Sequence, residues 1–370
     1  MSVRRNTCFI PALCSPLPAL ALSIAACMSS SPTRTGQGGS TGATGAGGST
    51  SGSTDGSTTG TGGATGAGGT AGAAAGTGGA AGPTDADGST VDSGATDAKS
   101  SGDASVFRKQ FSCPAGPFPA QNMGATMQAC TGFKLQYSWA EGPTWVASQN
   151  AFFFSNFVHS NPGGMAPGDI IKVDMNGQCS TWLTDVGTNG LAIGADGNIV
   201  AACHKTRSVT EFDINTKQAR IVANMYMGKL FDSPNDIVVH SNGTIYFTNP
   251  TYELGGRPGG FGPAAFRIDP MGVVSLISQG GAPNGIELSP DEKTLYIVQG
   301  GVWNLDANGV PTTKTGQASP NADGFSIDCA GNITIAGTNS AFGGPDGKTL
   351  IVVSNPPNVK LVQMTVPGLP

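Results

Sequence analysis

The chain has few charged side chains and few of the residues that bind transition metals. Only 12% of its 370 residues are charged, the net charge is −5, and there are three histidines. No Cys-x-x-Cys pair occurs, so the spacing typical of a structural zinc site is missing. Lysine and arginine do not cluster, which argues against a nucleic-acid partner. No long stretch shows a 3.6-residue apolar period, and we therefore expect few helices.

Glycine is abundant instead, and much of it lies in one segment. Residues 28–112 consist almost entirely of Gly, Ser, Thr and Ala and repeat fragments such as Thr-Gly-Ala. Because so few of these side chains can pack, we expect a flexible, disordered linker. Residues 113–370 are enough for one sizeable core, and we expect a single all-β domain there.

Residues 1–27 have the features of an export signal. Arg4 precedes an apolar stretch, residues 9–26, which prolines interrupt and which is too short for a stable membrane span. Residues 24–27 resemble the bacterial lipobox and make Cys27 the candidate for lipidation. We expect a lipoprotein of the outer membrane or cell surface that touches the membrane only through its lipid. If the lipobox is not used, the protein would be periplasmic or secreted.

The expected domain contains an odd number of cysteines, in a compartment that favours disulfides. Cys113 and Cys130 flank a Pro- and Gly-rich segment and form the disulfide that we predict. The pairing of Cys179, Cys203 and Cys329 stays open, since each could also be a small buried hydrophobe.

One phrase recurs along the domain, in which a turn dipeptide leads into a run of β-forming residues. Asp196-Gly197, Asn242-Gly243 and Asp291-Glu292 each open such a hairpin, and their starts lie 46 and 49 residues apart. This spacing is typical of a four-stranded propeller blade. The alternative is a β-sandwich with irregular hairpins. We expect a β-propeller, because the sandwich does not explain the constant offset of the residues described next.

Oxygen-bearing side chains stand just before these hairpins, beside glycine or proline. Four of them, in widely separated blocks, are Glu141, Asn235, Asn284 and Asp323, and Asn189 takes the same offset before an earlier hairpin. In a closed radial fold such residues can meet on the central axis. Carboxylates and amides are hard ligands that suit Ca2+. The plain alternative is that Asn189, Asn284 and Asp323 only set turns, as Asn-Gly and Asp-Gly often do.

These blocks resemble the senescence marker protein/gluconolactonase family, the regucalcin-like lactonases. The resemblance covers about residues 134–365. It rests on five phrases in family order, which are Glu-Gly-Pro-Thr-Trp at Glu141, Thr-Asn-Gly-Leu at Thr188, Ser-Pro-Asn-Asp at Ser233, Pro-Asn-Gly at Pro283 and Phe-Gly-Gly at Phe342. It implies a six-bladed β-propeller and one divalent metal among Glu141, Asn235, Asn284 and Asp323. We expect Ca2+, with Zn2+, Mg2+ or Mn2+ as alternatives.

The resemblance also implies the chemistry, which is hydrolysis of a sugar lactone or a similar small cyclic ester. The metal would polarise the carbonyl for attack by water, with Glu141 and Asp323 neutralising the ion. The proton of the water could go to Asp323 or to a metal-bound hydroxide, and this choice stays open. Asn189 and Asn235 are the expected substrate-binding residues. His204 resembles a channel-facing histidine of paraoxonase-type propellers and is a further catalytic candidate.

One departure from the family concerns the fifth repeat. In the family, some twenty more residues complete a blade between the segment that matches residues 333–337 and the Phe-Gly-Gly motif. Here only residues 338–341 separate that segment from Phe342. We therefore expect one truncated blade that lacks two outer strands. Separately, we expect the chain to be monomeric. A competing hypothesis is a non-catalytic propeller that binds calcium or another ligand at the cell surface.

Overall fold

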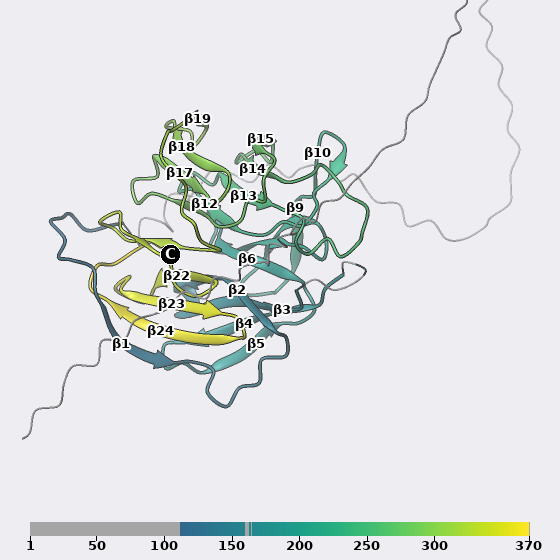
Figure 1. The fold of residues 1–370 in the computed structure, drawn as a ribbon. Helices are drawn as coiled ribbons and strands as arrows, with labels where there is room; N and C mark the ends of the chain where they lie inside the picture. Colours follow the sequence, from purple (N-terminus) through teal and green to yellow (C-terminus); the bar gives the residue numbers. More distant parts are fainter. Residues whose placement is uncertain (1–111, 160–162, 164, 370) are drawn as a thin grey trace, which may run out of the picture. The chain divides into compact units, whose positions relative to one another are not determined.

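The computed structural model describes residues 112–159, 163 and 165–369 (Figure 1). Within these residues the chain forms five four-stranded sheets and two two-stranded sheets, all antiparallel, with one short 3₁₀ turn, η2 (Ala147–Gln149). None of the helices among these residues is long and apolar enough to cross a membrane. The expected signal peptide, the lipidation candidate Cys27 and almost all of the expected linker lie outside the described residues.

Four of the five large sheets are up-and-down blades, each made of four strands that follow one another in the sequence. They are β2 (Trp139–Val146), β3 (Ala151–Phe157), β4 (Gly168–Asp174) and β5 (Cys179–Leu183); β6 (Thr188–Ile193), β7 (Ile199–Cys203), β8 (Ser208–Phe212) and β9 (Ala219–Ala223); β12 (Ile237–Val239), β13 (Ile245–Asn249), β14 (Ala264–Ile268) and β15 (Val274–Gln279); and β16 (Ile286–Leu288), β17 (Thr294–Ile297), β18 (Gly301–Leu305) and β19 (Pro311–Lys314). The predicted turns join inner strands. Gly197 and Gly243 have φ of +81° and +88°, which glycine adopts without steric cost.

The fifth large sheet joins the two ends of the described region. Its order is β1-β24-β23-β22, so that β1 (Met123–Gln128) pairs with β24 (Asn358–Met364) beside β23 (Thr349–Ser354) and β22 (Asn339–Gly343) (Figure 1). Met123 lies opposite Met364 and Gln128 opposite Lys360. The sheets therefore close on themselves through hydrogen bonds between the first and last strands, as in a propeller.

The number of blades differs from the six that the sequence predicted. The structure has five complete blades, and between β19 and β22 the chain forms only the hairpin of β20 (Ser326–Ile327) and β21 (Ile333–Thr334). Too few residues separate Thr334 from Asn339 to build two more strands. A second small hairpin, β10 (Met225–Tyr226) with β11 (Lys229–Leu230), follows β9. The all-β propeller class is confirmed, with five four-stranded blades.

The core lies between neighbouring blades. In one cluster, Phe152 and Phe154 of β3 pack with Ile351 and Val353 of β23, and all four side chains are buried. The innermost strands also contact one another: β2 contacts β6 and β22, β6 contacts β12, β12 contacts β16, and β20 contacts both β16 and β22. The hairpin β20–β21 thus supplies an inner strand to the ring although it lacks outer strands.

The disulfide pairing corrects the prediction. Cys113 is bonded to Cys329 and Cys130 to Cys179, while Cys203 is free and buried. The predicted Cys113–Cys130 bond does not form, because β1 lies between these residues and carries the chain along the edge of the fifth sheet. The first disulfide ties the segment before β1 to the turn of the hairpin β20–β21.

Candidate metal and catalytic site

The predicted oxygen ligands all lie in the innermost strand of their repeat or just before it. Glu141 lies in β2 and Asn189 in β6, whereas Asn235 and Asn284 stand two residues before β12 and β16, and Asp323 three residues before β20. Glu141, Asn189 and Asn235 are almost fully buried. The inner strands contact one another in a ring, and a hydrogen bond and charge interactions link Glu141, Asn284 and Asp323.

Glycines allow the inner strands to come this close. A Cβ atom on Gly142, whose φ is +51°, would lie 2.3 Å from Gly190 Cα and 2.4 Å from Asn189 O. Backbone hydrogen bonds join neighbouring repeats here, from Gly190 N to Asn235 O (2.6 Å) and from Gly285 N to Asp323 O (2.8 Å). Glycine follows four of the five oxygen-bearing residues, all but Asn235, and at Gly142 it does more than set a turn, because it lets the next inner strand approach.

Two of the predicted ligands are in direct contact. The Asn284 amide donates a hydrogen bond to Asp323 Oδ1 over 2.6 Å. Burial raises the pKa of Asp323, and this hydrogen bond only partly opposes the rise. Burial also raises the pKa of Glu141 well above its ordinary value, with the negative charges of Asp323 and Asp236 adding to the effect. Glu141 and Asp323 are thus close enough to repel each other inside the protein.

Asp236 belongs to this acidic group and was missed as a site residue, although the Ser-Pro-Asn-Asp block contains it. Its side chain accepts hydrogen bonds from the backbone N–H groups of Ile237 (3.0 Å) and Ile286 (3.2 Å). Burial raises its pKa to about 7, and the charge of Asp323 contributes. Three buried carboxyl groups, in Glu141, Asp236 and Asp323, therefore lie near one another, and burial raises the pKa of each.

This charge and these donor atoms fit a divalent cation. Buried carboxylates that raise one another's pKa are stabilised when a cation lies between them. Among the residues that the structure describes, no three His, Cys, Asp or Glu side chains are arranged as a metal-binding group. A metal at this place would therefore rely on the amide oxygens of Asn235 and Asn284 beside the carboxylates of Glu141 and Asp323. Such an oxygen-only set suits Ca2+ better than a softer metal.

His204, the predicted catalytic histidine, lies directly after β7 and is completely buried. Its ring packs on Phe157 with centroids 4.9 Å apart, and neither ring nitrogen has a hydrogen-bond partner of good geometry among the described residues. Burial lowers its pKa to about 4, so the imidazole is neutral at pH 7. A side chain without exposed surface does not fit direct proton exchange with a substrate.

A second histidine, which the sequence gave no reason to select, stands beside the acidic group. His159 Nδ1 lies 3.2 Å from Glu253 Oε1, and Ser233 Oγ donates to Glu253 Oε2 over 2.6 Å. The neighbouring Tyr252 donates its hydroxyl hydrogen to Ala282 O at 3.0 Å. His159 and Glu253 are 94 residues apart in loops without a repeated phrase, so no spacing pattern links them.

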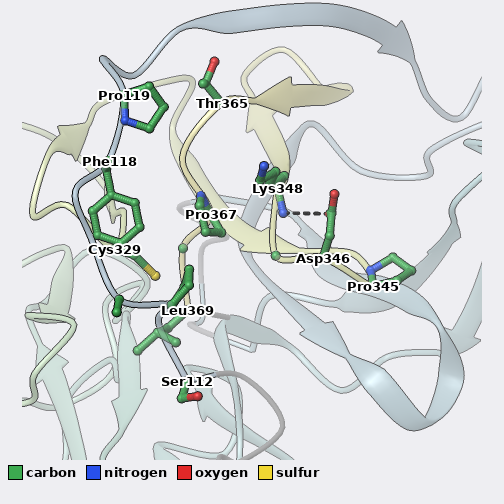
Figure 2. A pocket seen from close by; sticks show the side chains of 14 residues that line it. Ser112, Phe118, Pro119, Cys329, Pro345, Asp346, Lys348, Thr365, Pro367 and Leu369 are labelled. Atoms are coloured by element: carbon green, nitrogen blue, oxygen red, sulfur yellow. Dashed lines mark hydrogen bonds between the residues drawn. The ribbon is translucent and has the colours of Figure 1, made fainter.

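A pocket of about 430 Å³ lies elsewhere in the domain, next to the Cys113–Cys329 disulfide. Phe118, Pro367 and Leu369 are among its lining residues, together with Asp346 and Lys348 (Figure 2). None of the predicted ligands lines it, and its walls are mostly proline, glycine and apolar side chains. It is therefore separate from the channel site.

The closed ring of antiparallel blades defines a β-propeller, and buried carboxyl groups lie close together in or beside its inner strands. The model of the SMP-30/Gluconolactonase/LRE-like region matches residues 139–341, which include every residue of this site. The chain belongs to this family.

Individual relatives agree with this family. A gluconolactonase from Zymomonas mobilis is 32% identical over 256 residues, which are 60% of this chain and 71% of that protein. Among solved structures, a putative gluconolactonase matches with a TM-score of 0.55 and 22% identity, over 68% of this chain and 96% of that one. A gluconolactonase from Xanthomonas campestris matches with a TM-score of 0.53 and 23% identity, over 68% and 98%. These two structures support the propeller fold.

Proposed function

We propose that the protein is a metal-dependent lactonase that opens a sugar lactone, such as gluconolactone, or a similar small cyclic ester. The observation that carries the proposal is the group of buried carboxyls in Glu141, Asp236 and Asp323, whose pKa values are raised by burial and by neighbouring carboxylates. A propeller needs no such group for packing, and it is costly to bury without a cation. The name of the Zymomonas mobilis relative supplies the substrate class.

The proposed role of each residue follows from its charge. Glu141 and Asp323 would hold the ion and neutralise it, while the amide oxygens of Asn235 and Asn284 would complete its coordination without adding charge. When bound, the ion would polarise the lactone carbonyl and stabilise the oxyanion. We assign the proton of the attacking water to Asp323, whose carboxylate is held by the hydrogen bond from the Asn284 amide. Asn189 and Asn235 orient the substrate.

The cation that we propose is Ca2+, because every donor is a hard oxygen; Zn2+, Mg2+ and Mn2+ are the alternatives to be tested beside it. Export of the protein, with a lipid on Cys27, also remains a proposal. Two disulfides in one small domain support it, because such bonds persist in oxidising compartments.

The test is an assay of the purified full chain with glucono-1,5-lactone, δ-valerolactone and dihydrocoumarin, in which acid release is followed in a pH-stat. The chain is first stripped with a chelator and then supplied with Ca2+, Mg2+, Mn2+ or Zn2+ in separate reactions. We expect hydrolysis only with metal, and most with Ca2+. Full activity after stripping would refute the metal dependence. A chain that is inert towards all three lactones with every metal would leave the binding propeller as the better description.

A further inference from the structure

His159 is held from two sides, close enough to Asp323 to feel its charge. It lies two residues after β3, with 31% of its side chain exposed. The ring of Trp139 stacks on its imidazole with centroids 4.4 Å apart, and Glu253 Oε1 lies 3.2 Å from Nδ1. Because Nδ1 faces this carboxylate, Nε2 is the nitrogen left to exchange a proton with a bound molecule.

Glu253 is itself fixed. Its side chain is 2% exposed, and its Oε2 accepts the hydrogen bond from Ser233 Oγ. The backbone N–H of Glu253 in turn donates a hydrogen bond to Ser233 Oγ over 3.1 Å. Ser233 stands two residues before Asn235, and Trp139 two residues before Glu141. The supports of His159 therefore come from the segments that supply two of the proposed ligands.

The charges around His159 favour its protonated form. The hydrogen bond with Glu253 is the largest influence and raises the pKa of His159, while partial burial opposes it. The negative charge of Asp323 adds to the rise, which places that carboxylate near the imidazole. The neighbouring His204 is neutral at pH 7 and so does not repel the imidazolium. Burial would raise the pKa of Glu253, but the hydrogen bonds with His159 and Ser233, together with the charges of the two nearby histidines, outweigh it and lower the pKa.

Opening a lactone requires two proton transfers. Water adds to the carbonyl carbon and loses one proton to a base, and the ring C–O bond then breaks. The oxygen that leaves is an alkoxide, and it needs a proton from an acid. The sequence suggested Asp323 or a metal-bound hydroxide as the acceptor of the water proton and assigned the role of acid to no residue.

We propose that His159, positioned by Glu253, is the acid that protonates the leaving alkoxide; this rests on the proposed lactonase function. The Nε2–H bond breaks as the new O–H bond forms, and the pair of electrons from the ring C–O bond stays on that oxygen. The products are a hydroxyl group and a carboxylic acid, which ionises and releases its proton to solvent. The proton that Asp323 took from water returns through solvent to His159, so no further reactant is needed.

The test compares leaving groups. Glucono-1,5-lactone and δ-valerolactone release an aliphatic alkoxide, whereas dihydrocoumarin releases a phenoxide, whose conjugate acid has a pKa of about 10, like tyrosine. We expect His159→Gln to lower kcat on the aliphatic lactones by about 10²-fold or more, with little change in KM. On dihydrocoumarin the loss should be less than about tenfold, because a phenoxide leaves without an acid.

Glu253→Gln tests the positioning role separately. The amide keeps a hydrogen bond to His159 but lacks the charge that raises its pKa, so the imidazolium should lose its proton at lower pH. The alkaline limb of kcat on an aliphatic lactone should therefore shift to lower pH. His240→Gln is the matched control, because His240 Nδ1 also lies near a carboxylate, Glu292 Oε2 at 3.7 Å, but in the turn between β12 and β13. We expect no change in that variant.

The possible outcomes separate the two proposals. Suppose that the wild type is active. The role of His159 alone would then be overturned if His159→Gln kept full activity on the aliphatic lactones, or if it lost activity by the same factor on all lactones. An unshifted alkaline limb in Glu253→Gln would also count against it, and this readout needs only one aliphatic substrate. A wild type that hydrolyses none of the lactones would remove the lactonase function, and the role of His159 with it.

Discussion

Removing the Cys113–Cys329 disulfide should cost more stability than any other change to the cysteines. This bond joins residues 216 apart, whereas Cys130–Cys179 joins residues 49 apart. In the chain-entropy model, a cross-link stabilises the fold by restricting the unfolded chain, and its effect grows with the logarithm of the loop length. The model gives about 5 kcal/mol for the longer loop and about 4 kcal/mol for the shorter one. These values are upper estimates, since residual structure in the unfolded chain reduces both.

The assay is urea unfolding of the full chain under non-reducing conditions. We compare wild type with Cys113→Ser/Cys329→Ser and with Cys130→Ser/Cys179→Ser, and derive the free energy of unfolding from the midpoint and slope of each transition. A domain of this kind is stable by about 5–15 kcal/mol, so a loss of several kcal/mol is readily measured. The longer loop should show the larger loss. A loss below about 1 kcal/mol for Cys113→Ser/Cys329→Ser, or the reverse order of the two pairs, would refute the reasoning.

Three further predictions concern the channel site. Asp323→Asn removes the proposed base and a charged ligand, so kcat on glucono-1,5-lactone should fall by about 10²-fold or more. His204→Gln should lower kcat much less. Comparable large losses of kcat in both variants would contradict these roles. Saturation of the stripped domain with Ca2+ at a hundredfold excess over Kd should stabilise it by about 2.7 kcal/mol and raise Tm by about 5–10 °C. Calorimetry measures this shift in Tm. An unchanged Tm would mean that the four oxygen ligands serve only as turn residues. Gly142→Ala places a Cβ 2.3 Å from Gly190 Cα, so both Tm and lactonase activity should fall, and an unchanged Tm would show that the strands can move apart.

The sequence predicted the repeat well, because hairpin formation is a local event. The Asn242-Gly243 turn joins β12 to β13, where the phrase indicated a hairpin. Asn284 and Asp323 were selected as neighbours 39 residues apart, and their side chains are hydrogen-bonded. A residue that recurs at one offset in a radial fold must return to the same distance from the axis, which is why this part of the site could be predicted.

The parts that failed depend on contacts that follow no repeat. The disulfide prediction chose Cys113 and Cys130 because they flank a Pro- and Gly-rich segment. In the structure Cys113 is bonded to Cys329 in the hairpin β20–β21, and β1 lies between Cys113 and Cys130. His159 and Glu253 meet from two loops whose lengths no pattern fixes. The count of six blades came from the family resemblance, whereas the shortened segment before β22 leaves five complete blades and a hairpin.

The pairing of β1 with β24 has a consequence for synthesis of the protein. The ribosome makes β1 first among the described strands and β24 last, yet both belong to one sheet. The earlier blades can form as the chain emerges, because each is built from consecutive strands, but the fifth sheet must wait for the final one. β22 of that sheet lies against β2, which carries Glu141. The ring that surrounds Glu141 is therefore complete only after the last strand has left the ribosome, and the proposed metal would bind after that step.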